Sequence, residues 1–347
     1  MNIKKLLWAI ALIGIVIFAY FAYFVYSAMF KPNTAFNNEE AYIYIPTNAD
    51  YNEVRSQLAP LLINIDKFDA LARQKKYVSN IKAGKYVIKK GMTNNDIINS
   101  IRSNNLPIKV AFNNQETFED LAGRMSTQIE ADSLALLNVM TSEEFLKTNS
   151  FDSKTALGMY IPNSYEFFWN TSAEQFRDRM LKEYHRFWTE SRMAKAKALN
   201  LSPNQVITLA SIVQKETSKV DERPKVAGVY INRLKIGMPL QADPTVIYAI
   251  KEKSGDFDQT IKRVLYKDLE LDSPYNTYKY AGLPPGLITM PDISSIDAVL
   301  NYEKHDFYYF VADVNNFGYH KFAKNLSQHN RNRQEYVRWI NQQGVNR

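Results

Sequence analysis

The 347-residue sequence contains no cysteine, which excludes several kinds of chemistry at once. The chain can have no thiol nucleophile, no thiolate metal ligand and no disulfide, although an oxidising compartment stays permitted. Histidine is scarce as well, with four residues, and none forms the H-E-x-x-H pair of a zinc protease. We therefore expect no metal site and no cofactor.

A concentrated block of basic charge is also missing. The chain carries 43 basic and 36 acidic residues, and its formal net charge of +7 is spread along its length. A groove for single-stranded nucleic acid interleaves basic and aromatic side chains, and no such stripe is present. We expect no nucleic-acid partner, whereas a membrane surface or an anionic cell-wall polymer suits the charge.

A long apolar run is present at the N-terminus. Lys4 and Lys5 precede an uncharged stretch over residues 6–30, which Lys31 and Pro32 end. The stretch exceeds the roughly 20 residues that a helix needs to cross a bilayer. A cleaved signal peptide has a shorter apolar region and a small-x-small cleavage site, so we interpret the run as a retained membrane anchor. The alternatives are a signal peptide and a buried core helix.

The lysines before this run indicate its orientation. Basic residues favour the cytoplasmic side of a span, so residues 1–5 form a short cytoplasmic tail and residues 6–30 a single-pass span of the cytoplasmic (inner) membrane. Residues 31–40 are a polar linker, and the remaining chain lies outside the cytoplasm, in the periplasmic or extracytoplasmic space.

Two strand–turn–helix patterns follow the linker. Residues 42–45 alternate as a strand does, residues 86–88 repeat the pattern, and Thr93 is placed to cap a helix. We predict a small α/β module over residues 41–106, which is either a spacer or a polymer-binding domain. A larger, helix-rich domain over residues 107–347 completes an α+β fold.

The larger domain contains an aromatic segment, "LGMYIPNSYEFFWN", over residues 157–170. It is either a wall on which sugars stack or a packed loop. A strand is expected within "DFYYFVAD", and a final helix is expected over residues 327–342.

One predicted helix places a carboxyl group on its apolar face. Ser202 and Pro203 are a cap and first-turn pair, and Val206, Leu209, Val213 and Glu216 then share one helical stripe. Burial raises the pKa of a carboxyl group, and the negative end of a helix acts in the same direction. A carboxylic acid that stays protonated near neutral pH can protonate the leaving oxygen of a glycosidic bond. The alternative is a structural ion pair of Glu216 with Arg223 or Arg233.

The segments after Glu216 have the composition of a sugar site. "GMPLQADPTVIY", "YNTY" and "AGLPPG" combine amides and hydroxyls with aromatic rings and rigid turns. Rings stack on the apolar faces of sugars, while small polar groups bond the hydroxyls.

These segments also carry a resemblance. "LASIVQKET", "VAGVYINRLKIGMPLQADPTVIYAI", "SPYNTYKYAGLPPGLI" and "HKFAKNLSQHN" resemble, in order and spacing, the MltG/YceG family of endolytic murein transglycosylases. The resemblance implies that residues 41–106 are a LysM-like subdomain and that residues 107–347 are a YceG-like catalytic domain. Gln214 stands where many members of the family have glutamate, so position 214 cannot supply the acid.

The resemblance implies a membrane-anchored lyase that cuts nascent peptidoglycan glycan strands and helps terminate their elongation. Glu216 would be the general acid and then the base, and the product would end in 1,6-anhydro-N-acetylmuramic acid. Partners would be glycan strands, the membrane, and peptidoglycan synthases or other division and elongation proteins. The expected substrate-binding residues, each with a role in loop structure as its alternative, are Gln241, Asp243, Thr245, Tyr275, Asn276, Thr277 and Tyr278.

Three other functions fit the same compartment. Ser79 and Lys82 match S-x-x-K, but the K-T-G of a serine acyl-enzyme is missing. A lysozyme-like hydrolase would use Asp243 or Glu222 as a second carboxylate. A peptidoglycan-binding scaffold would need no acid at all.

The motif near the C-terminus contains His320, His329 and Asn330, which we read as packing or hydrogen-bonding residues.

Overall fold

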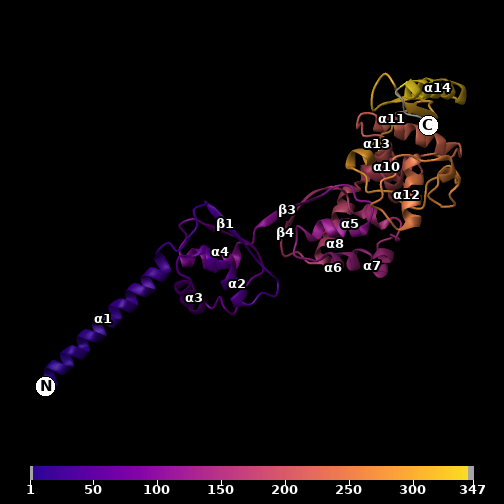
Figure 1. Ribbon diagram of the computed structural model, residues 1–347. Helices are drawn as coiled ribbons and strands as arrows, with labels where there is room; N and C mark the ends of the chain where they lie inside the picture. Colours follow the sequence, from indigo (N-terminus) through magenta and orange to yellow (C-terminus); the bar gives the residue numbers. More distant parts are fainter. Residues whose placement is uncertain (1–2, 343–347) are drawn as a thin grey trace. The chain divides into compact units, whose positions relative to one another are not determined.

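The computed structural model describes residues 3–342 and divides the chain into two compact units (Figure 1). The first unit extends to Val110 and adds residues 127–131 and 165–172. The second comprises residues 111–126, 132–164 and the chain from Ala173 onward. The expected tail 1–5 and domain 107–347 each include residues outside the described range. The sequence analysis expected a single boundary between residues 106 and 107. In the structure, residues 127–131 and 165–172 also belong to the first unit.

The N-terminal helix α1 (Ile3–Phe30) is long and apolar enough to cross a membrane. Its side chains are exposed as far as residue 23, so it is not the core helix of a soluble unit. The last turn of α1 is held against the rest of the first unit by a hydrogen bond, which the Asn94 side-chain amide donates to the carbonyl of Ala28 at 2.9 Å. Length and composition alone suit either a membrane anchor or a signal sequence.

The rest of the first unit is organised around a two-stranded antiparallel sheet. Strand β1 (Glu40–Ile45) pairs antiparallel with β2 (Gly84–Lys89), with Ile43 opposite Tyr86. Around them lie α2 (Tyr51–Leu58), the short η1 (Ala59–Leu61), α3 (Ile65–Gln74) and α4 (Asn94–Ser103). Thr93 caps α4 in a reciprocal capping box with Asp96, as predicted. The likeness of this module to LysM domains stays a prediction.

The second unit begins with short helices. They are α5 (Phe118–Ser126), α6 (Ser133–Met140), α7 (Glu143–Thr148), α8 (Ala173–Phe187) and α9 (Glu190–Ala198). Strands β3 (Pro107–Phe112) and β4 (Asn163–Phe168) form a separate two-stranded sheet, and most residues of both strands belong to the first unit. The aromatic segment begins as the turn η2 (Ala156–Met159), and residues 157–161 are all buried. Those residues are packed, as the second alternative for this segment required.

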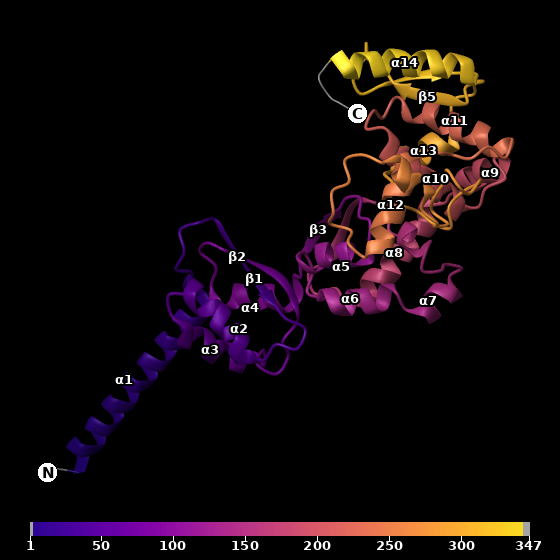
Figure 2. The ribbon, with the colours of Figure 1, turned by 45° about the vertical axis from the view of Figure 1, so that its right-hand side comes forward.

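Helix α10 (Pro203–Glu216) occupies the middle of the second unit. It contacts α11 (Arg223–Lys235), α12 (Asp243–Ser254) and α13 (Ile293–Leu300), and both ribbon views show it among them (Figures 1 and 2). Ser202 and Gln205 form the N-terminal capping box. Val206, Leu209 and Val213 are fully buried, which confirms the predicted apolar stripe. This packing fixes where the last residue of α10, Glu216, lies.

The C-terminal part completes the unit. Strands β5 (Tyr309–Ala312) and β6 (His320–Ala323) pair antiparallel, and α14 (Leu326–Gln342) lies along β5 (Figure 2). A one-turn helix, η3 (Tyr266–Glu270), follows the loop after α12. The mixture of helices and small antiparallel sheets confirms the α+β class.

Candidate active site

A pocket of about 510 Å³ lies at the C-terminal end of α10. Its walls come from segments far apart in the sequence, and α10, α11, α12, η3, β5, β6 and α14 all contribute. The lining residues with polar or aromatic side chains are Glu216, Arg233, Gln241, Asp243, Tyr266, Tyr278, Tyr309, Phe310, His320, His329, Asn330 and Arg333.

A second pocket, of about 540 Å³, lies at the other end of α10. It is lined mainly by leucines, amides and Pro284–Pro285, and Lys235 is its one ionisable residue. That pocket holds no carboxyl group and no imidazole, whereas the pocket at the C-terminal end of α10 holds Glu216, whose pKa is raised, and is the candidate active site.

Glu216 occupies the last position of α10 and is half-buried. Its Oε2 atom is enclosed and has no hydrogen-bond partner, and the residue lines the pocket. Burial raises the pKa of Glu216 to about 7, and the nearby Asp243 carboxylate adds to the rise. Charges on His320 and Arg233 and a hydrogen bond from Tyr230 act in the opposite direction but do not cancel it.

The ion pairs considered for Glu216 do not form. The Arg233 guanidinium instead donates to the carbonyl oxygens of Tyr308 and Leu240, each at 2.6 Å. Arg223 donates to the Ser294 hydroxyl at 2.6 Å and lies 3.5 Å from the Asp292 carboxylate. The structural alternative for Glu216 is therefore wrong, because both arginines are engaged elsewhere.

Three of the seven expected substrate-binding residues line the pocket: Gln241, Asp243 and Tyr278. The Tyr278 hydroxyl donates to Asp243 Oδ1 at 2.5 Å. Gln241 has a backbone φ of 50°, a left-handed conformation that costs energy in a residue other than glycine. Such strain gathers at functional sites, where the surrounding structure maintains it.

The other four expected residues lie behind the wall and are buried. Thr245 and Thr277 join their hydroxyls at 2.9 Å, and Thr277 Oγ1 accepts from the backbone of Ala242 at 3.0 Å. The Asn276 amide donates to two carbonyls of the η3 loop, and Tyr275 packs on a neighbouring tyrosine with ring centroids 4.6 Å apart. They shape the turns that carry Gln241, Asp243 and Tyr278.

The C-terminal elements supply a wall that the sequence analysis did not assign to the site. His329 stacks on Tyr309 with centroids 5.2 Å apart, and Arg333 reaches the Tyr266 hydroxyl at 3.5 Å. The signal was present in the sequence: Leu326, His329, Asn330 and Arg333 follow helical spacing and all face the pocket.

A second carboxylate, Glu222, lies near the pocket without lining it. It accepts from the backbone and the ring of His320 at 2.6 and 2.9 Å, and from the Thr217 hydroxyl at 3.0 Å. Both of its oxygens are therefore occupied by protein groups.

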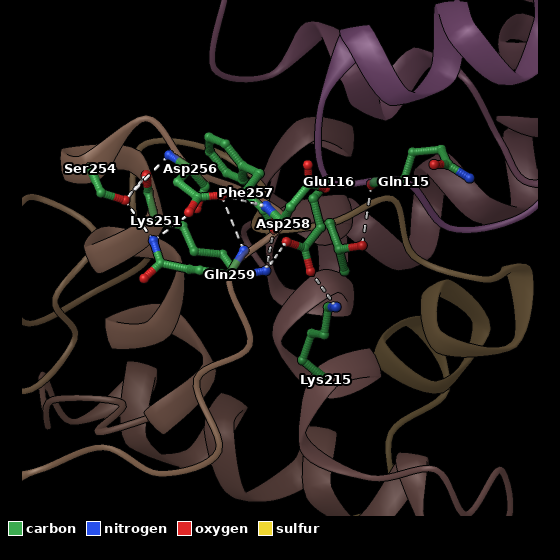
Figure 3. Close-up of polar contacts among 10 residues, drawn as sticks. Gln115, Glu116, Lys215, Lys251, Ser254, Asp256, Phe257, Asp258 and Gln259 are labelled. Atoms are coloured by element: carbon green, nitrogen blue, oxygen red, sulfur yellow. Dashed lines mark hydrogen bonds and ion pairs between the residues drawn. The ribbon is translucent and has the colours of Figure 1, made fainter.

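The residue before Glu216 belongs to a charged cluster. Glu116 accepts from Lys215 on one oxygen at 2.6 Å and from Lys251 on the other at 2.8 Å, and the close-up shows the Lys215 contact (Figure 3). This bridge connects the end of α10 to α12 through the segment that precedes α5.

Among residues 3–342, there is no group of three or more His, Cys, Asp or Glu side chains that could hold a metal ion.

Comparisons with known proteins find similar sequences and a similar solved structure. The sequence profile of the YceG-like family matches residues 43–335. The endolytic murein transglycosylase of Bacillus subtilis is 32% identical over 279 residues, which are 76% of this chain and 75% of that protein. The endolytic murein transglycosylase of Streptococcus pneumoniae D39 is 29% identical over 333 aligned residues. These residues are 86% of this chain and 59% of that protein. A crystal structure of a yceG-like protein from Listeria monocytogenes aligns with a TM-score of 0.56 at 29% identity, covering 85% of this chain and 99% of that chain.

Proposed function

Because the chain belongs to the YceG-like family, we propose that it is an endolytic murein transglycosylase, a lyase that cuts peptidoglycan glycan strands internally. The observation that carries the proposal is the carboxyl group of Glu216. It lies in a pocket, has no ion-pair partner, and its pKa is raised to about 7. At neutral pH a large fraction of this group still holds its proton.

In the proposed reaction, Glu216 protonates the oxygen that bridges N-acetylmuramic acid and N-acetylglucosamine. Positive charge develops at C1 of the muramyl residue as the bond to this oxygen breaks. A buried acid suits this step because it still holds its proton at neutral pH, whereas an exposed carboxyl group has already lost it.

The muramyl C6 hydroxyl then closes onto C1 and gives the 1,6-anhydro end. No water attacks, so the second carboxylate that positions water in hydrolases is not needed. The hydroxyl proton passes to a base in the pocket, and the carboxylate left on Glu216 is one such base.

The substrate-binding proposal rests on the three expected residues that face the pocket. Gln241, Asp243 and Tyr278 offer an amide, a carboxylate and a phenol to sugar hydroxyls. Thr245, Tyr275, Asn276 and Thr277 support these residues from behind.

We propose the cellular arrangement from α1. The helix serves as a retained single-pass anchor with its N-terminus in the cytoplasm, which places the pocket on the side where peptidoglycan is assembled. Peptidoglycan synthases and the division or elongation machinery are the partners that this location suits.

One hydrolytic alternative has an observation in its favour: Asp243 shares the pocket with Glu216 and is exposed there. A lysozyme-like enzyme could use Asp243 to activate water. Glu222 does not offer the same route, since its oxygens are occupied by His320 and Thr217.

The test is digestion of purified glycan strands by the full chain in detergent, with mass spectrometry of the products. The wild type should give ends that lack one water, and Glu216→Gln should give no cleavage. Glu252→Gln is the matched control, because Glu252 is half-buried and pairs with Lys154 at 2.6 Å away from the pocket. Hydrolysed ends would favour Asp243 as a second carboxylate, and undiminished cleavage by Glu216→Gln would overturn the proposal.

A further inference from the structure

A buried carboxylate holds an imidazole at the edge of the candidate active site. Glu222 is 6% exposed, and both of its oxygens accept hydrogen bonds from His320, one from the backbone N–H and one from ring Nδ1. The His320 ring lines the pocket that contains Glu216. The Glu222–His320 pair thus joins the turn after α10 to the start of β6.

The bonding of this pair decides which ring nitrogen of His320 is left to accept a proton. Burial alone would raise the pKa of Glu222, but the bonds and charge of His320 and the bond from Thr217 outweigh it, so the pKa is lowered and the carboxylate is ionised. An ionised carboxylate accepts the Nδ1 proton, so the lone pair of the unprotonated ring lies on Nε2 and can accept a proton there. Within residues 3–342, no protein group hydrogen-bonds Nε2 of His320. The Phe310 ring packs edge-on at 5.0 Å and fixes the plane of the imidazole.

The other described histidines are differently placed. His329 lines the same pocket, but its Nδ1 is enclosed without a partner and no carboxylate holds it. His305 has both ring nitrogens bound to backbone groups, at 2.9 and 3.0 Å. His185 is exposed on α8. Among the residues that the structure describes, His320 alone combines a buried carboxylate partner with a position in the pocket.

The pair is also connected to the acid itself. Thr217 follows Glu216 directly and donates to the Glu222 carboxylate at 3.0 Å, so Glu222 holds both the end of α10 and the imidazole. In Glu216, Oε2 is enclosed without a hydrogen-bond partner. The His320 ring lines the same pocket, so a second group is available there to receive a proton.

We propose that His320 is the base that takes the proton of the muramyl C6 hydroxyl, and that Glu222 is the residue that positions it. This inference rests on the proposed function and assigns its second proton transfer to His320 in place of Glu216. His320 would be a catalytic residue, and Glu222 a positioning residue that never touches the sugar.

The step is balanced without any co-reactant. The O6–H bond breaks, its proton goes to Nε2 of His320, and its electron pair forms the O6–C1 bond. The C1–O bond to the leaving sugar breaks, and that oxygen takes the proton of Glu216. The resulting imidazolium and carboxylate have opposite charges in one pocket and stabilise each other, and the ionised Glu222 also stabilises the imidazolium. A proton transfer from His320 to Glu216 restores the starting state.

Several ionisable groups surround the two residues and enter any pH profile. Glu216 is the last residue of α10, and Glu222 lies in the turn after it. The groups on the other elements that line the pocket or act on Glu216 are Tyr230 and Arg233 (α11), Asp243 (α12), Tyr266 (η3), Tyr278, Tyr309 (β5), and His329 and Arg333 (α14).

The experiment compares His320→Gln and Glu222→Gln in the full chain in detergent, with purified glycan strands as substrate. His185→Gln and Asp221→Asn are matched controls, since His185 is exposed and Asp221 is an exposed carboxylate that accepts from Tyr319 beside the same hairpin. We expect His320→Gln to lower kcat by about 10²–10³-fold with little change in KM, as for loss of a general base. Glu222→Gln should lower kcat by about 10–100-fold, as for loss of an orienting partner.

A structural role is separated by rescue and by the pH profile. Imidazole added to His320→Ala should restore part of the rate, and in His320→Gln the loss of rate toward acidic pH should disappear. Thermal melting confirms that each variant is folded. If folded His320→Gln keeps the wild-type kcat, or if imidazole restores nothing while the acidic limb is unchanged, the inference is wrong. The proposed function then still stands, provided that the wild type gives anhydro ends and Glu216→Gln does not.

Discussion

At the scale of single residues, Glu216 shows how a position can set the chemistry of a carboxyl group. The same side chain on a solvent-facing turn would be ionised at neutral pH. Here the apolar stripe of α10 carries it into the protein, and one of its oxygens is enclosed without a partner. Burial then raises its pKa to about 7, which is the property that an acid catalyst needs.

The first prediction concerns the rate of cleavage above neutral pH. Since Glu216 must be protonated, kcat should fall with rising pH, with a midpoint near 7 and then about tenfold per pH unit. The Asp243 carboxylate helps to raise the pKa of Glu216, so Asp243→Asn should move this limb to lower pH. The measurement is a pH–kcat profile of both proteins, and a shift of the variant to higher pH would refute the assignment.

The second prediction concerns stability. The folded state holds the Glu216 proton up to about pH 7, whereas the unfolded chain loses it near its ordinary value of 4.5. This carboxyl group therefore destabilises the folded state increasingly as pH rises from about 4.5 to 7, by at most about 3 kcal/mol. Glu216→Gln should melt at a higher temperature than the wild type at pH 8, and the gain should vanish near pH 4.5. An equal gain at both pH values would point to another cause, and Glu252→Gln is the control.

At the scale of secondary-structure elements, local signals in the sequence located helices better than they located the site. Ser202 and Thr93 were recognisable as caps because their side chains satisfy the first backbone N–H groups of a helix. Thr277 and Asn276 were expected at the sugar but lie behind the wall. Residue type alone does not tell whether a hydroxyl or amide bonds a ligand or the backbone of a neighbouring turn.

The wall formed by β5, β6 and α14 was missed for a related reason. His320 and His329 were read as packing residues, because nothing local shows that a strand about 100 residues after Glu216 lies beside it. The pairing of Glu222 with His320 is a long-range contact of this kind. The spacing of residues 326, 329, 330 and 333 on α14 indicated a common face, though not what that face meets.

The third prediction concerns the bridge between α10 and α12. Burial would raise the pKa of Glu116, but hydrogen bonds from Lys215 and Lys251 lower it below its usual value (Figure 3). Glu116→Gln removes the charge that both lysines share, and we expect the folded state to lose about 1–3 kcal/mol. The cleavage rate should also fall, because Lys215 adjoins Glu216.

The matched control for this bridge is Glu335→Gln, which removes an exposed pair with Lys321. An exposed pair contributes about 1 kcal/mol or less, so this variant should be close to the wild type. Thermal melting and kcat measure both effects. If Glu116→Gln is no less stable than Glu335→Gln, the bridge does not hold α10 in place.

At the scale of the whole molecule, the chain forms two compact units, of which the first begins with an apolar helix and the second contains the candidate active site. The net charge of +7 suits work beside anionic surfaces. Length and composition do not distinguish a retained anchor from a cleaved signal sequence, so the location of the enzyme depends on the fate of α1.

The fourth prediction is that α1 is retained. Protein extracted from membranes should have the intact mass of all 347 residues, and it should resist extraction by alkaline carbonate. A mature protein that begins near Lys31 would show that residues 1–30 are a signal sequence.

The most direct measurement is a titration of the Glu216 carboxyl group itself, by the infrared difference between the wild type and Glu216→Gln across pH in the intact chain. The protonated carboxyl band should persist to neutral pH and disappear with a midpoint near 7. A midpoint near 4.5 in protein that still cuts glycan strands would contradict the account, because the acid would then be ionised at the pH where it has to act.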